Sequence, residues 1–288
     1  MKILITGSNG QLGTELVSRY TDRPFDEVFA GDLPDLDITS EESVSQIFAN
    51  IAPDLVINCA AWTAVDAAEE KEIAAYAVNA EGPAILAQNC ARVGARMIHL
   101  STDYVFAGDA TEPYQENDHA APVTAYGRTK LAGEKYVQEI LPNNHVIIRT
   151  AWLYSPHGHN FVKTIIRAQA ERETLSVVTD QIGQPTSASD LADQIVALAD
   201  NYQGSGIFHG TNSGVTSWFE FARAIMEEIG EDPERILPTG SSSYVQLAPR
   251  PPYSVLGHQA WMSVGMQPMR DWREALHDAM PEITVSSD

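Results

Sequence analysis

The stretch that decides the fold is KILITGSNGQLG, residues 2–13. Residues 2–6 form an isoleucine-rich apolar run, which predicts a buried strand. Apolar side chains beyond residue 11 recur at spacings of three and four, which predicts a helix. A strand, a glycine turn and a helix in this order are typical of a dinucleotide-binding unit. We therefore expect a pyrophosphate to lie against the turn made by Gly7, Gly10 and Gly13.

An acidic residue follows the next predicted strand, which covers residues 26–31. This residue, Asp32, can bind the hydroxyls of an adenosine ribose, and its charge repels a 2′-phosphate. No lysine or arginine comes directly after it, because Leu33 and Pro34 follow. The pattern predicts NADH or NADPH as the cofactor, with a preference for NADH. A solvated loop aspartate is the alternative interpretation.

Strand-like and helix-like segments continue to alternate as far as residue 150. Further strands are expected at residues 54–58, 96–100 and 146–148. Helices are expected at residues 65–93, with a break near Gly82 and Pro83, and at 126–140. The segment 65–93 is expected to pack on the sheet and to carry no chemistry. Alternation at this spacing predicts an α/β fold with a doubly wound parallel sheet of the Rossmann type.

The pattern loosens after residue 154. We interpret residues 1–154 as the dinucleotide-binding domain, joined by a return segment near residues 175–200. Residues 155–288 are interpreted mostly as a smaller C-terminal lobe that binds substrate. Within it, a strand is expected at 175–178 and helices at 161–170, 189–199, 217–229 and 269–279.

The composition and charge of the chain argue against several classes of protein. The chain has 288 residues, 44% of them hydrophobic, and a net charge of −21. So acidic a chain is not expected to bind nucleic acid non-specifically, and no apolar run approaches the ~20 residues that span a bilayer. With no signal-peptide pattern at the N-terminus, we expect a soluble cytoplasmic protein. The two cysteines, Cys59 and Cys90, lie in apolar contexts and are expected to be free thiols.

Three side chains with proton chemistry are expected at one edge of the sheet. Thr102 follows a predicted strand, and Tyr126 and Lys130 lie four residues apart on one face of the next helix. An ammonium beside a phenol favours the phenolate, so we expect a proton donor and acceptor that works near neutral pH. Beside a nicotinamide, this set suits hydride transfer to a carbonyl carbon. The Tyr-x-x-x-Lys spacing alone is common in helices, so the prediction depends on the glycine turn and Thr102 as well.

These motifs resemble the extended short-chain dehydrogenase/reductase family. The glycine spacing, the hydroxyl at Thr102 and the pair Tyr126 and Lys130 match it in the same order. Within the family, the chain is similar to the dTDP-4-dehydrorhamnose reductases. That similarity rests on residues 6–13, 58–66, 101–106, 126–134, 149–154, 160–161, 180–186 and 250–251. It implies NAD(P)H-dependent reduction of the 4-keto group of dTDP-4-dehydro-L-rhamnose to dTDP-L-rhamnose, with the proton supplied by Tyr126.

The resemblance implies three sets of site residues. The catalytic set is Thr102, Tyr126 and Lys130. The cofactor set is Gly7, Gly10, Gln11, Leu12, Gly13, Asp32, Asp37, Ile38, Ala61, Trp62, Thr63, Tyr126 and Lys130. The substrate set is Thr102, Asp103, Tyr104, Trp152 and Arg250, with Arg250 facing the diphosphate.

Two departures bear on the assignment within the family. Tyr104 stands where the nucleotide-sugar 4,6-dehydratases have a glutamate that serves elimination of water, which favours simple carbonyl reduction. Trp62 stands where a tyrosine or histidine is more usual, so its hydrogen bond changes. Trp152 as a core residue and Arg250 as an exposed loop cation remain alternative interpretations.

Other functions and partners stay open. The alternatives are another nucleotide-sugar epimerase or reductase, and a non-catalytic NAD(P)-binding regulatory subunit similar to the methionine adenosyltransferase β subunit. His157 and His159 lack a third ligand, so no metal site is assigned, and Mg²⁺ enters only through the resemblance. Glu15 is interpreted as a solvated side chain. The expected partners are a nucleotide sugar and a second copy of the chain, without nucleic acid or membrane.

Overall fold

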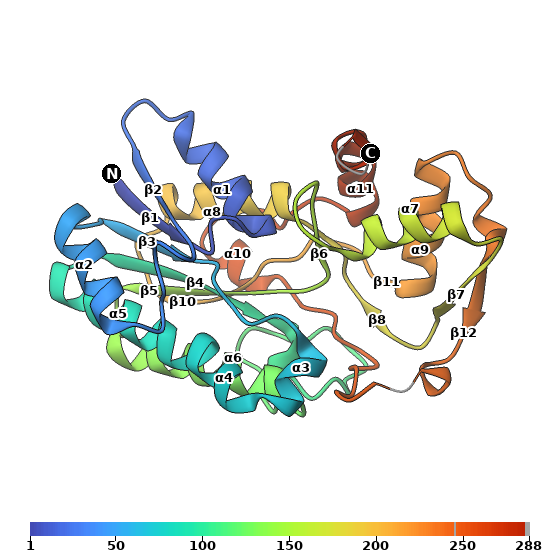
Figure 1. The fold of residues 1–288 in the computed structure, drawn as a ribbon, viewed down its shortest axis with the longest axis horizontal. Helices are drawn as coiled ribbons and strands as arrows, with labels where there is room; N and C mark the ends of the chain where they lie inside the picture. The colour runs from blue at the N-terminus through green and yellow to red at the C-terminus, as the bar shows by residue number, and fades with distance from the viewer. Residues whose placement is uncertain (245, 286–288) are drawn as a thin grey trace.

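The computed structural model describes residues 1–244 and 246–285, so the last three residues of the expected lobe lie outside it. Its larger part is a six-stranded sheet in which every neighbouring pair is parallel. The strand order is β10-β5-β4-β3-β1-β2. The strands are β1 (Lys2–Thr6), β2 (Glu27–Gly31), β3 (Leu55–Asn58), β4 (Arg96–Thr102), β5 (His145–Thr150) and β10 (Gly206–His209). The chain runs outward from β1 in both directions, which confirms the doubly wound α/β fold (Figure 1).

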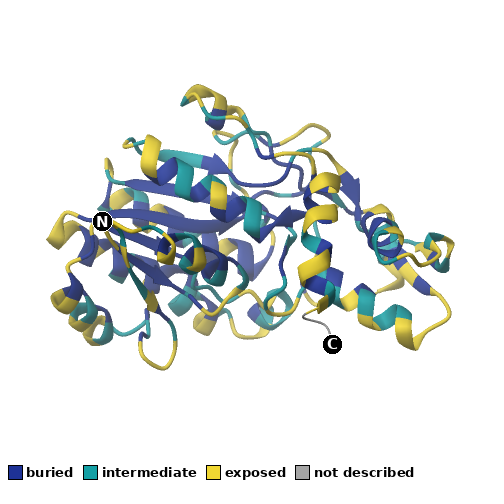
Figure 2. Cartoon of the chain, turned by 90° about the horizontal axis from the view of Figure 1, so that it is seen from above, coloured by how far each residue is buried: buried dark blue, intermediate teal, exposed yellow. Residues whose placement is uncertain are grey.

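Helices cover both faces of this sheet, and its inner strands β1, β3, β4 and β5 are almost entirely buried (Figure 2). On β1, Ile3 and Ile5 face one core and Leu4 faces the other. The first face is covered by α1 (Gln11–Thr21) and α8 (Ala188–Asn201). The second is covered by α2 (Glu41–Ile51), α5 (Gly82–Val93) and α6 (Ala125–Ile140). Among the described residues, no helix is both long and apolar enough to cross a membrane.

Side-chain caps fix where several helices begin. The Ser40 hydroxyl accepts a hydrogen bond from the Ser43 N–H, as expected for a helix beginning at Glu41. The Thr124 hydroxyl accepts one from the Gly127 N–H at 3.0 Å. Helix α6 therefore begins at Ala125, and Tyr126 lies in its first turn.

The smaller lobe has a core of its own, at the right of Figure 1. Strand β7 (Leu175–Val178) pairs in parallel with β12 (Ile236–Thr239). The helices around them are α7 (Phe161–Glu171), α9 (Trp218–Glu228) and α11 (Trp272–Val285). Four two-residue strands join the lobe to the sheet: β6 (Leu153–Tyr154), β8 (Ile182–Gly183), β9 (Thr186–Ser187) and β11 (Thr216–Ser217).

The expected return segment, residues 175–200, contributes to both the lobe and the main sheet. Its helix, α8, packs on α1 beside the main sheet, but its strand, β7, belongs to the lobe because it pairs with β12. The strand that does return, β10, was missed, since only Ile207 and Phe208 mark it as apolar. The short helix α10 (Gln259–Ser263) was also not expected.

The predicted helix break near Gly82 and Pro83 is wrong. The helical segment is interrupted earlier, at Lys71, between α3 (Val65–Glu70) and α4 (Glu72–Tyr76). A π-helical turn, η1 (Ala77–Glu81), then leads directly into α5. Pro83 is the second residue of α5 and follows directly on this π-helical turn.

A glycine in α6 tests the packing of this turn. A Cβ at Gly133 would lie 2.1 Å from the carbonyl oxygen of Asn79 in η1. Helix propensity alone makes alanine better than glycine by about 0.5–1 kcal/mol, but forced overlap in a core costs about 1–3 kcal/mol. We expect G133A to lower the free energy of unfolding by about 1–2 kcal/mol in urea denaturation. Lys135→Ala, on the exposed side of the same helix, is the control. Equal stability of the two variants would contradict the close contact.

Candidate active site

A cavity of about 1310 Å³ opens at the carboxyl ends of the strands and extends to the lobe. Open α/β sheets bind ligands at this edge, where the strand order reverses. In this sheet the reversal lies between β1 and β3. The cavity wall contains almost every predicted site residue: Gly7, Gly10, Gln11, Leu12, Gly13, Asp32, Asp37, Ile38, Ala61, Thr63, Thr102, Asp103, Tyr104, Tyr126, Lys130, Trp152 and Arg250.

Trp62 is the one predicted residue outside that wall. Its side chain packs in a small cluster with Tyr104 and Tyr126. Its indole N–H donates to the carbonyl oxygen of Ala64 at 3.2 Å. The tryptophan therefore lies behind the predicted catalytic tyrosine rather than in the cavity.

The glycine turn fits a pyrophosphate. Gly7 has φ +66°, and a Cβ at Gly13 would lie 2.2 Å from the carbonyl oxygen of Gly7. Side chains at these positions would therefore close the turn. Gly10 precedes α1 without a side-chain cap, so the first N–H groups of the helix are left for an anion.

Asp32 is held against the glycine turn. One carboxylate oxygen accepts the N–H of Asn9 at 2.9 Å, and the other accepts the N–H of Leu33 at 2.8 Å. Asp37 instead binds its own loop, since Oδ1 accepts the N–H and the hydroxyl of Thr39. Asp32 is thus placed to meet the adenosine end of a dinucleotide.

Burial controls the ionisation of the predicted catalytic pair. It raises the pKa of Tyr126 to about 12, although a hydrogen bond from Thr102 acts in the opposite direction. It lowers the pKa of Lys130 to about 8, against the attraction of Glu134. The Lys130 ammonium donates to the carbonyl oxygen of Leu100 at 2.5 Å. The sequence predicted a lowered pKa for this phenol, whereas burial raises it, so the phenol of Tyr126 is protonated at neutral pH.

Thr102 and its neighbours form the wall beside the phenol. The Thr102 hydroxyl donates to Oδ1 of Asp103 at 2.9 Å and accepts the N–H of Tyr104. Burial raises the pKa of Asp103 to about 6, although the nearby hydroxyls of Ser254 and Thr102 act in the opposite direction. The ring of Tyr104 meets that of Tyr126 edge-on, with centroids 5.6 Å apart.

A buried ion pair lies beneath this set. Arg149 of β5 donates to both carboxylate oxygens of Glu134 in α6, at 2.9 and 2.7 Å. The Ser101 hydroxyl donates to the same carboxylate at 2.5 Å. The pair therefore ties the helix that carries Tyr126 and Lys130 to strands β4 and β5.

Asn79 is a supporting residue that sequence reasoning missed. Its amide accepts the N–H of Trp62 at 2.8 Å and donates to the Trp62 carbonyl oxygen and the Thr129 hydroxyl. It lies in η1, inside the segment expected to carry no chemistry, and it is fully buried. An asparagine in an alanine-rich helix was the available signal, and the segment has a second one at Asn89.

The lobe side of the cavity is aromatic. Trp152 stacks on Trp218 with ring centroids 3.6 Å apart, and both rings line the cavity. Trp152 has φ +47°, and a Cβ at Gly183 would lie 2.6 Å from its indole. Both interpretations of Trp152 therefore apply, because it lines the cavity and packs in the lobe. Further lobe residues of the wall were missed: Phe161, Gln181, Trp218 and Tyr244.

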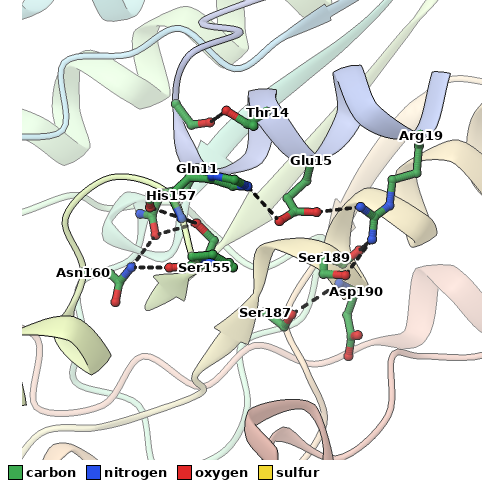
Figure 3. A network of polar contacts seen from close by, with 12 residues as sticks. Gln11, Thr14, Glu15, Arg19, Ser155, His157, Asn160, Ser187, Ser189 and Asp190 are labelled. Atoms are coloured by element: carbon green, nitrogen blue, oxygen red, sulfur yellow. Dashed lines mark hydrogen bonds and ion pairs between the residues drawn. The ribbon is translucent and has the colours of Figure 1, made fainter. Parts of the chain in front are cut away.

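A polar network joins the glycine turn to the lobe (Figure 3). Oε1 of the Gln11 side chain accepts hydrogen bonds from Asn160 at 3.1 Å and Ser155 at 3.3 Å. Glu15 is buried, pairs with Arg19 at 2.5 Å and lies 3.6 Å from His157. The interpretation of Glu15 as a solvated side chain is therefore wrong.

Arg250 lines the cavity, but it is not a free loop cation. Its Nη2 donates to Oδ2 of Asp66 at 2.5 Å, and only 17% of its side chain is exposed. Within residues 1–244 and 246–285, no three histidine, cysteine, aspartate or glutamate side chains are grouped to hold a metal ion. Cys59 and Cys90 are both free thiols, as expected.

The parallel sheet, the glycine turn and the threonine, tyrosine and lysine beside it define a nicotinamide-dependent reductase of the extended short-chain dehydrogenase/reductase class. A family model described as "RmlD substrate binding domain" matches residues 1–285. The chain belongs to this family, that of the dTDP-4-dehydrorhamnose reductases.

Relatives across the whole length support this placement. The chain is 46% identical to a dTDP-4-dehydrorhamnose reductase of Streptomyces griseus, over 97% of this chain and 93% of that protein. It is also 46% identical to a probable dTDP-4,6-dihydroxy-2-methyloxan-3-one 4-ketoreductase of Streptomyces antibioticus, over 99% and 97%. The crystal structure of the Bacillus anthracis dTDP-4-dehydrorhamnose reductase in complex with NADP superimposes with a TM-score of 0.94, at 40% identity over 98% and 99% of the two chains.

The buried lysine predicts a pH effect on stability. Lys130 has a folded-state pKa of about 8, below its ordinary value of 10.5. Between these values the unfolded chain binds more protons than the folded one, so stability rises with pH. As the pH rises from about 8 towards 10.5, we expect the free energy of unfolding of the wild type to rise by roughly 3 kcal/mol relative to that of Lys130→Met. Urea denaturation of both proteins at several pH values measures the difference. Parallel stability curves would contradict the buried ammonium.

Proposed function

We propose that the protein reduces the 4-keto group of a dTDP-linked 4-keto-6-deoxy sugar, with dTDP-4-dehydro-L-rhamnose converted to dTDP-L-rhamnose. The observation that carries this is a buried, protonated phenol, Tyr126, beside Thr102 in a cavity that continues from a dinucleotide turn to an aromatic lobe. With a volume of about 1310 Å³ and walls from both the glycine turn and the lobe, such a cavity has room for a dinucleotide and a nucleotide sugar together. The names of the Streptomyces relatives support a 4-keto sugar as substrate.

The bound dinucleotide would supply a hydride to C4 of the sugar. As the carbonyl π electrons move to oxygen, Tyr126 would transfer its phenolic proton to that oxygen, which gives the alcohol. The Thr102 hydroxyl, which donates to Oδ1 of Asp103 in this structure, would turn its proton towards the same oxygen and stabilise its developing charge. Lys130, at a pKa of about 8, would stabilise the tyrosinate that remains and contact the nicotinamide ribose.

The neighbouring residues suit reduction better than elimination. Elimination of water needs an acid and base beside the sugar in addition to the tyrosine, and Tyr104 offers no carboxylate. Burial raises the pKa of the Tyr104 phenol, so it stays neutral and acts as a wall. Asp103 is the carboxylate of this stretch, and its Oδ1 is engaged by Thr102.

The cofactor preference is proposed from Asp32. Its carboxylate lies against the glycine turn, and the neighbouring cavity residues Leu33, Leu36 and Asp37 offer no cation for a 2′-phosphate. We therefore favour NADH over NADPH, although the Bacillus anthracis relative is described in complex with NADP. A requirement for Mg²⁺ rests on the family resemblance alone. A cytoplasmic location and a homodimer likewise stay predictions.

The direct test is substrate-dependent oxidation of NADH and of NADPH, followed by absorbance. We expect turnover with dTDP-4-dehydro-L-rhamnose, and dTDP-4-keto-6-deoxy-D-glucose is the comparison substrate because a Streptomyces niveus relative is named for its reduction. Cofactor binding without turnover of either sugar would favour the regulatory-subunit alternative.

Tyr126→Phe removes the proposed proton donor and keeps the ring. We expect kcat to fall by about 10²–10⁴, because general acid catalysis contributes that much, while the Kd of the cofactor stays within about twofold. Tyr76→Phe, at a phenol that hydrogen-bonds the exposed Tyr136, is the matched control and should keep full activity. Unchanged kcat in Tyr126→Phe would remove the tyrosine from the mechanism.

Asp32→Ala removes the charge that faces the ribose. We expect the ratio of kcat/KM for NADPH to that for NADH to rise about tenfold, since a like-charge contact of about 1–2 kcal/mol is lost. Asp35→Ala, an exposed neighbour in the same loop, should leave the ratio unchanged. A wild-type preference for NADPH that persists in Asp32→Ala would overturn the assignment.

A further inference from the structure

We propose that Asp66 is a positioning residue that holds Arg250 in the cavity for the anionic part of the substrate. The inference rests on the proposed function, since it concerns the diphosphate of a nucleotide sugar. Asp66 closes the stretch of residues 58–66 that resembles the family, and neither the sequence nor the mechanism gave it a role.

Asp66 contacts one loop at two points. Its Oδ2 accepts Nη2 of Arg250 at 2.5 Å, and its Oδ1 accepts the N–H of Ala248 at 3.0 Å. Nη1 of Arg250 donates to the carbonyl oxygen of Ala248 at 3.2 Å. A single carboxylate therefore fixes both the backbone of the loop and the plane of its guanidinium, 184 residues further along the chain.

The pair lies at the edge of the site rather than out in solvent. The Arg250 side chain is 17% exposed, whereas that of Asp66 is 42% exposed. Arg250 and Pro251 are part of the cavity wall, beside Tyr104. Pro251 also packs against Gly108, where a Cβ would lie 2.4 Å from the proline Cβ. The loop is therefore held from both sides, with Arg250 in the cavity wall.

Helix α3 connects this loop to the proposed proton donor. Glu69, one turn after Asp66, accepts the N–H of Ala125 at 2.8 Å. Ala125 begins α6 and precedes Tyr126. One short helix thus holds the start of the catalytic helix and the loop with the cation. It fixes the separation between the group that would anchor the phosphates and the phenol that would protonate the carbonyl oxygen.

The guanidinium keeps donors for a second anion. Arginine has five N–H donors, and the hydrogen bonds to Asp66 and Ala248 involve Nη2 and Nη1. Asp66 has two opposite effects on a diphosphate: it orients the cation, and it repels the anion through its own charge. Since the Asp66 oxygens are engaged by the loop, we expect orientation to be the larger effect.

The test compares Asp66→Asn with Glu70→Gln, at an exposed carboxylate on the same helix. For Asp66→Asn we expect KM for the dTDP sugar and the Kd of dTDP to rise about tenfold. We expect kcat within about twofold and an unchanged Kd for the cofactor. Glu70→Gln should match wild type in KM for the dTDP sugar, in kcat and in the Kd values of dTDP and of the cofactor. Thermal unfolding of each variant checks that the fold is retained.

A double variant tests whether Asp66 acts through Arg250. Arg250→Gln alone should raise KM at least as much as Asp66→Asn, and adding Asp66→Asn to it should have little further effect. Additive effects, or an unchanged or lower KM in Asp66→Asn, would overturn the proposal. Binding of dTDP by calorimetry needs no turnover. Loss of dTDP affinity in Asp66→Asn with an inactive wild type would therefore reject the proposed function while supporting the positioning role.

Discussion

The buried pair of Glu134 and Arg149 is the interaction on which the site depends. Its two hydrogen bonds join α6 to β5, and the Ser101 hydroxyl adds β4. Breaking such a pair by removing one partner costs about 3–5 kcal/mol, because the remaining charge is left in a dry interior. Lys130 lies one turn before Glu134, so the same anchor sets where the lysine meets the Leu100 carbonyl oxygen. The contact of α6 with strands β4 and β5 thus holds the predicted catalytic residues in place.

Burial, more than the proximity of charges, sets the state of the catalytic groups. It raises the pKa of Tyr126 and lowers the pKa of Lys130, and both shifts favour the neutral form of the side chain. A protonated phenol suits a carbonyl that needs a proton after accepting a hydride. The helical spacing of the two residues predicted that they share a face, but it carried no information on how dry that face is. This is why the expectation of a phenolate was wrong, while a protonated phenol agrees with the predicted role of Tyr126 as proton donor.

Local patterns predicted most of the sheet and much of the cavity wall. The apolar run before Gly7 and the helical pattern beyond residue 11 depend on neighbours in sequence, so they could be predicted directly. The strand β10 is marked by two apolar residues, and its place depends on pairing with β5. The bond from Asp66 to Arg250 spans most of the chain, so no local pattern reveals it. Sequence reasoning therefore found the cofactor half of the site better than the substrate half, which long-range contacts assemble.

The stacked indoles of Trp152 and Trp218 give the cavity an optical property. The chain has five tryptophans, and these two face each other at 3.6 Å on the lobe wall. Their emission depends on that stacking and on the polarity around the rings. A reduced nicotinamide absorbs where indoles emit, so a dinucleotide in the same cavity would quench them by energy transfer. The protein thus carries an intrinsic fluorescent probe of its own occupancy, placed where the lobe meets the ligand.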